Sequence, residues 1–144
     1  MHLKLTNGTP AKYTLGQLRR DNPQTSFPKL IPDELLASYD VYTYTRPTPS
    51  EYDNLAWRLI DDDFVNVNGA WILPYKLEAL PLEQAEQNIR SRRDSLLAET
   101  DWLVIKAYER SENISAEWEL YRQALRDITT QEGFPFNVTW PTKP

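Results

Sequence analysis

The sequence predicts an α+β protein with a small, mainly antiparallel β-rich module over residues 1–80 and a helical module over residues 81–144. Three observations support this division. Short β-prone runs separated by glycine and proline turns fill the first half. A helical period of apolar residues begins at Leu82. An extended tail with Phe-Pro and Trp-Pro pairs follows Gly133, and we expect it to fold back over apolar helix surface.

The first elements are short. His2–Thr6 alternates like a strand, and Asn7-Gly8 suits a turn that requires positive φ. A short helix is predicted over residues 13–20 and ends before Pro23, because the residue before a proline avoids the α region. Residues 32–37 read as one helical turn with acidic residues at its positive end.

The remainder of the β-rich module contains a further strand and a hairpin. Residues 39–45 have strand composition, and the prolines in residues 46–49 then break it. The clearest hairpin covers residues 64–73, because Asn68-Gly69 is the dipeptide that type I′ turns prefer. Pro74 is expected to stop further strand pairing, as at a sheet edge.

Two apolar stripes predict the helices. The first repeats every seven residues, and the second steps by four, three, four and three. Thr100-Asp101 is a plausible N-cap, so two helices are favoured over one long one in the first stripe. Ser115 is a candidate cap for the helix of the second stripe, and a short connection predicts a helical hairpin or three-helix unit. The stripes are Leu82, Ile89, Leu96 and Leu103, with Ala85 between, and Ile114, Trp118, Tyr121, Leu125 and Ile128.

Composition argues against several functions. The net charge of −5 disfavours nucleic acid as the main partner, and no apolar run is long enough to predict a membrane span. Nothing in the N-terminal residues predicts an export signal. No cysteine is present, which excludes disulfides and thiolate chemistry.

No motif predicts an enzyme, a cofactor or a metal. His2 is the only histidine, and no glycine-rich phosphate loop exists. Asp61-Asp62-Asp63 is predicted to be a solvated turn, because adjacent carboxylates do not converge on one cation. A catalytic pair of carboxylates is not excluded by the sequence, although nothing in it singles out two particular acidic residues.

Charged residues recur in the helical module. We expect structural ion pairs between facing helices, because each basic cluster carries its own acid. The alternative is a basic cluster that grips an acidic partner. The residues concerned are Arg93, Asp94, Arg122, Arg126 and Asp127.

Several motifs in residues 82–144 together resemble the phage tail assembly chaperone family. They are Arg93-Asp94-x-Leu96-Leu97-x3-Asp101-Trp102, Trp118-x2-Tyr121-Arg122-Gln123-Ala124-Leu125-Arg126-Asp127-Ile128, Gly133-Phe134-Pro135 and Trp140-Pro141. The first half looks more loosely like the leading segment that often precedes this module.

The resemblance implies a bacteriophage protein that binds a trimeric tail-fibre protein, or another tail protein, and assists its folding or assembly in the host cytoplasm. Self-association is left open. The alternatives are a structural virion component, such as a fibre tip or adaptor, and a host-facing binding module. Tyrosine and tryptophan are favoured at interfaces, and the predicted partner-binding residues are aromatic, although some must belong to the core. They are Trp71, Trp102, Trp118, Phe134, Phe136 and Trp140.

Overall fold

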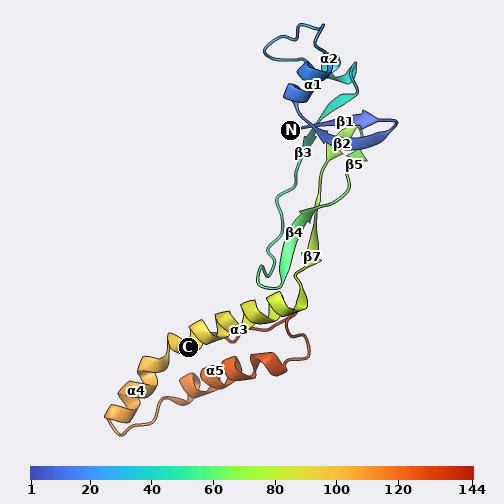
Figure 1. Cartoon of the computed structure of the whole chain (residues 1–144). Coiled ribbons are helices and arrows are strands. Elements are labelled where there is room, and N and C mark those ends of the chain that lie inside the picture. The colour runs from blue at the N-terminus through green and yellow to red at the C-terminus, as the bar shows by residue number, and fades with distance from the viewer. The chain divides into compact units, whose positions relative to one another are not determined.

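The computed structural model describes all 144 residues and confirms the α+β class, with a β-sheet followed by helices (Figure 1). The chain forms two compact units. The sheet unit contains residues 1–50 and 59–76, and the helical unit contains residues 51–58 and 77–144. Residues 51–58 and 77–80 therefore belong to the same compact unit as the helices. The division into modules at residues 80 and 81 stays a prediction from the sequence.

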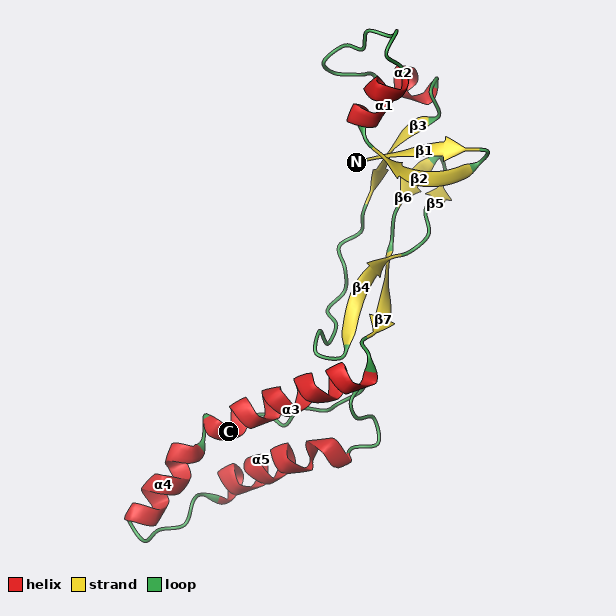
Figure 2. Cartoon of the chain, viewed as in Figure 1, coloured by secondary structure: helices red, strands yellow, loops and turns green.

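The sheet unit is built on five strands in the order β2-β1-β3-β6-β5 (Figure 2). Its pairs are antiparallel except β3–β6, which is parallel and aligns Tyr44 with Trp71. The edge strand β2 was not predicted, because Pro10 disguises it, although an edge tolerates a proline. The strands are β1 (His2–Thr6), β2 (Thr9–Tyr13), β3 (Val41–Thr45), β5 (Val65–Val67) and β6 (Ala70–Ile72).

Both predicted Asn-Gly turns are confirmed. Asn7 and Gly8 have φ values of 51° and 80°, and Asn68 and Gly69 have values of 50° and 86°. Positive φ at both central positions is the requirement of a type I′ turn, whose twist matches that of the flanking strands. The two dipeptides therefore set the register of β1 with β2 and of β5 with β6.

Both predicted short helices also form. The helix α1 (Leu15–Asp21) begins with a reciprocal capping box between Thr14 and Gln17, and α2 (Asp33–Ala37) carries acids in its first turn. Their buried leucines, Leu18 and Leu36, share a core cluster with Val41 of β3. A second cluster contains Leu3, Tyr44 and Leu73.

The prediction for Pro74 was wrong. Strand pairing resumes directly after it in β7 (Tyr75–Ala79), which pairs with β4 (Trp57–Asp61). A proline lacks only the amide proton, and the Pro74 carbonyl still accepts a hydrogen bond from the Asp62 amide at 3.0 Å. Neither β4 nor β7 was predicted.

The prediction of a solvated turn was also wrong for Asp61, which lies in a strand. Asp61 ends β4 and forms ion pairs with Lys12 and Arg46. Asp62 lies 3.1 Å from the Lys76 ammonium, and hydrogen bonding to Lys76 and to the Asp63 amide lowers the pKa of Asp62. The carboxylates of Asp61 and Asp62 therefore pair with different cations.

The helical unit contains three α-helices and a 3₁₀ turn, and the predicted break at Thr100 is confirmed. They are α3 (Leu82–Ala98), α4 (Asp101–Glu109), α5 (Ala116–Arg126) and η1 (Asp127–Thr130). The core of this unit consists of Ile89, Tyr121, Leu125 and Ile128. None of the helices in the structure is both long and apolar enough to cross a bilayer.

The tail folds back on α3 and α5, as predicted. Phe134, Val138 and Trp140 pack against the core cluster of the helical unit. The Gln131 side chain holds Thr139 by two hydrogen bonds, from the Thr139 amide at 2.8 Å and to its carbonyl at 2.9 Å. Gly133 is required because a Cβ there would clash with the backbone of Asn137.

Candidate partner-binding surface

The helix α4 is the most apolar helix of the protein, yet none of its residues is buried. Four large apolar side chains on it are exposed to solvent: Trp102 by 57%, Val104 by 41%, Ile105 by 58% and Tyr108 by 86%. We call these four side chains the α4 face. Several large apolar side chains exposed on one short helix are typical of an interaction site.

The opposite side of α4 explains why the helix forms. Leu103 and Ala107 are half-buried, and together with Trp118 they line a pocket of about 200 Å³ at the α4–α5 connection. Residues four apart lie on the same side of a helix, so this narrow strip faces the helical unit. This contact leaves the other large apolar side chains of α4 exposed to solvent.

A buried arginine holds α4 at the break. The Arg122 side chain on α5 is only 9% exposed, and its Nη1 donates to the Leu97 carbonyl at 2.9 Å and to Thr100 Oγ1 at 2.5 Å. Its Nη2 donates to Asp101 Oδ1 at 2.8 Å. We call this set of contacts the Arg122 clamp. It joins the last turn of α3 to the first residue of α4, and so fixes the direction in which α4 leaves α3.

Thr100 stands at the predicted N-cap position, but its hydroxyl does not cap α4. The hydroxyl donates to the Leu97 carbonyl at 2.9 Å and accepts from Arg122. Arg122 also faces the negative end of the α3 dipole, where a cation is favoured. The start of α4 after Thr100 was therefore predicted correctly. The Thr100 hydroxyl, however, belongs to the Arg122 clamp and does not cap the helix.

Of the five charged residues predicted to form ion pairs, Arg122 alone connects different helices, and its carboxylate is Asp101. Arg93 pairs with its neighbour Asp94 at 2.8 Å. Arg126 and Asp127 both contact the side-chain amide of Gln123, which lies three and four residues before them. Local partners are reached at lower entropic cost, which accounts for this arrangement.

Four of the predicted partner-binding aromatics lie against the helical unit. Phe134 and Trp140 pack on its core cluster, and Trp118 packs edge-on against Tyr121 with ring centroids 5.8 Å apart. Phe136 meets Trp57 edge-on, with ring centroids 5.7 Å apart. Trp102 differs from these four, because it belongs to the α4 face.

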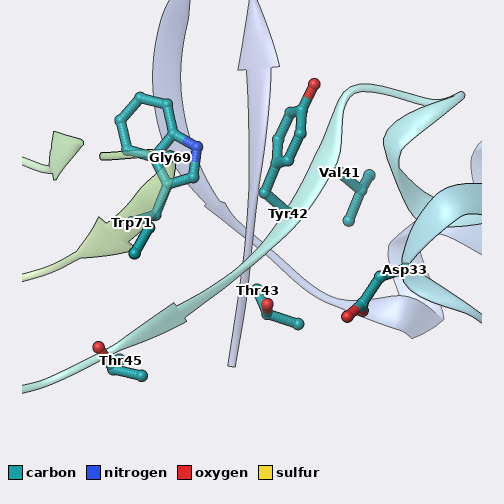
Figure 3. A pocket seen from close by; sticks show the side chains of 8 residues that line it. Asp33, Val41, Tyr42, Thr43, Thr45, Gly69 and Trp71 are labelled. Carbon is teal, nitrogen blue, oxygen red and sulfur yellow. The ribbon is translucent and has the colours of Figure 1, made fainter. Parts of the chain in front are cut away.

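Trp71 lies in the sheet unit, beside a pocket of about 200 Å³ over β3 and β6 (Figure 3). In this view its indole and the Tyr42 ring lie on one side of β3, and the Thr43 and Thr45 hydroxyls lie near the strand (Figure 3). Trp71 also packs against the cluster of Leu3, Tyr44 and Leu73. Part of its indole therefore packs in the core of the sheet unit.

The titratable groups with shifted pKa values have structural partners. Burial, together with a 2.5 Å hydrogen bond to Asp21, raises the pKa of Tyr13 to about 12. Burial and the N-terminal ammonium lower the pKa of His2. No group of three or more histidine, aspartate or glutamate side chains is arranged to hold a metal ion.

The part of the chain that contains the α4 face is similar to a known protein family. The family model described as phage tail assembly chaperone protein matches residues 86–144. No curated protein and no solved structure matches the chain. The matched segment includes most of α3, all of α4 and α5, and the tail. Residues 86–144 are therefore similar to the phage tail assembly chaperone family, as the motifs in this part of the sequence had indicated.

Proposed function

We propose that the protein is a tail-fibre assembly chaperone that binds a trimeric fibre protein in the host cytoplasm and assists its folding or assembly. The exposure of the α4 face is the observation that supports this proposal most directly, because it lies within the matched segment. A tail assembly chaperone must contact a phage tail protein. The α4 face is the largest group of exposed apolar side chains on any one helix of the chain.

The physical reason for such a protein lies in the client. Trimeric β-rich fibres fold through non-local strand pairings, which are slow and leave apolar surface exposed meanwhile. An amphipathic helix can place its apolar side chains in a hydrophobic groove of another protein. The α4 face would cover apolar surface of the fibre chain until its three copies close on one another. The net charge of −5 would keep the complex soluble.

Coexpression of a tail-fibre protein from the same phage with and without this protein tests the proposal. We expect the yield of soluble trimeric fibre, measured by size-exclusion chromatography with light scattering, to rise several-fold when the protein is present. Equal yields in the two cultures would overturn the chaperone role.

Purified particles distinguish the chaperone from a virion component. Absence of the protein from particles, measured by quantitative mass spectrometry, supports a chaperone that is released after assembly. Presence in fixed stoichiometry to the fibre, combined with unchanged fibre yield in coexpression, would instead establish a structural tip or adaptor.

A further inference from the structure

A second surface of the helical unit has the features of a peptide-binding groove. It has a volume of about 410 Å³ and is formed by α3, α5, the tail and the segment before β4. We call it the Arg92 groove. Volumes of this size are typical of sites that hold several ligand groups.

The walls of the groove are mainly apolar. Leu55, Leu96, Trp140 and Pro141 are half-buried, and Tyr121 is buried. Leu55, Leu96 and Trp140 pack against the core cluster and still present part of their surface to solvent. An apolar side chain of a ligand would therefore displace water from both aliphatic and aromatic surface.

One cation in the groove has no partner. The neighbouring arginines of α3 are engaged, since Arg90 contacts Glu86 at 2.7 Å and Arg93 contacts Asp94 at 2.8 Å. Arg92 is exposed and forms no hydrogen bond, ion pair or ring contact. The other two charges at the groove, Glu99 and Lys143, pair with each other at 3.3 Å. The groove thus has a net positive charge on a chain whose overall net charge is −5.

We propose that the Arg92 groove binds an extended segment of the client protein in which an aspartate or glutamate side chain lies next to an apolar residue. The carboxylate would accept hydrogen bonds from the Arg92 guanidinium, whose planar donors match a carboxylate. The adjacent apolar side chain would lie on Leu96 and Trp140. The inference rests on the proposed function for the source of the segment, and it adds a polar determinant to the apolar contact of the α4 face.

A pair of synthetic peptides tests the inference with the full chain. The probes are acetyl-Ala-Leu-Asp-Phe-Ala-amide and the same peptide with asparagine for aspartate, both blocked so that no terminal carboxylate contributes. Binding is followed by the NMR shift of the Trp140 indole N–H, identified as the signal that Trp140→Phe removes. We expect the aspartate peptide to bind roughly tenfold more tightly than the asparagine peptide. Salt should weaken only the former.

Matched variants establish the role of Arg92. Arg92→Gln should reduce affinity for the aspartate peptide to that of the asparagine peptide, and Arg92→Lys should restore part of it. Arg20→Gln is the charge-matched control, because this exposed arginine lies in α1 and outside the groove. Arg92 is exposed and unpartnered, so folding should be unchanged, as circular dichroism checks.

Three outcomes would overturn the inference: equal binding of the two peptides, equal binding by wild type and Arg92→Gln, or no shift at millimolar peptide. A concentration-dependent dimer that Arg92→Gln abolishes would assign the groove to a second copy and also overturn it. None of these results affects the fibre yield in coexpression, so the chaperone proposal is tested independently.

Discussion

The helices α4 and α5 contain similar apolar side chains but use them in opposite ways. In α5, Tyr121 and Leu125 are buried in the core of the helical unit. In α4, Trp102, Ile105 and Tyr108 are exposed, and no residue is buried. The difference shows that apolar content alone does not separate residues that stabilise the fold from residues available to a partner. The predictions below test this contrast, beginning with the largest expected effect on stability.

Leu125→Ala in α5 should lower the free energy of unfolding by about 3 kcal/mol, because it leaves a cavity beside Ile89 and Ile128. Urea titration followed by circular dichroism measures the change. A loss below about 1 kcal/mol would mean that α5 does not hold the core of the helical unit together.

Gly133→Ala should lower the free energy of unfolding by about 2 kcal/mol, because the new Cβ would lie 2.9 Å from the Asn137 Cβ and clash with the backbone. The loss should come from the tail, which covers α3 and α5. Hydrogen exchange should show lower protection at the Asn137 and Thr139 amides, which donate to Gly133 and Gln131. Unchanged exchange at both amides would contradict the expectation.

Arg122→Leu should cost about 1–2 kcal/mol and act mainly on α4, because it removes the contacts to Leu97, Thr100 and Asp101. Part of the loss is offset because Arg122 Nε is buried without a hydrogen-bond partner. Hydrogen exchange should rise more in α4 than in the rest of the helical unit. Equal changes in α4 and α5 would show that the Arg122 clamp is not specific to α4.

Ile105→Ser on the α4 face should change the free energy of unfolding by less than about 0.5 kcal/mol, since exposed positions contribute little. It should nevertheless reduce the yield of soluble fibre in coexpression. Leu120→Ser is the matched control, because Leu120 is 72% exposed on α5 and outside the α4 face. Similar yields from both variants would argue against the α4 face as the client contact.

The elements with strong local signals could be predicted from the sequence. The Asn-Gly turns, the break at Thr100 and the folded-back tail are examples, because each depends on residues close in the chain. The strands β4 and β7 were missed because the paired residues lie about 20 apart in the sequence. In addition, Pro74 directly precedes β7 and was expected to end strand pairing. Nothing local marks such a partnership.

The candidate surface was predicted only in part. Trp102 was named, whereas Val104, Ile105 and Tyr108 were missed, because a helical apolar pattern normally indicates burial. The signal that identifies them is that apolar residues in 102–108 occur on all sides of the helix, which is more than one packed face requires. The pair of Arg122 with Asp101 could not be foreseen, since it depends on the angle between α3 and α4.

The Arg122 clamp has a consequence for the thermodynamics of binding. A helix that is loose in the free protein loses conformational entropy when a partner orders it, and this loss reduces the affinity. Because Arg122 ties Asp101 to the end of α3, α4 is already oriented before any partner binds. Much of the entropy cost of presenting Trp102 and Ile105 is therefore met when the protein itself folds.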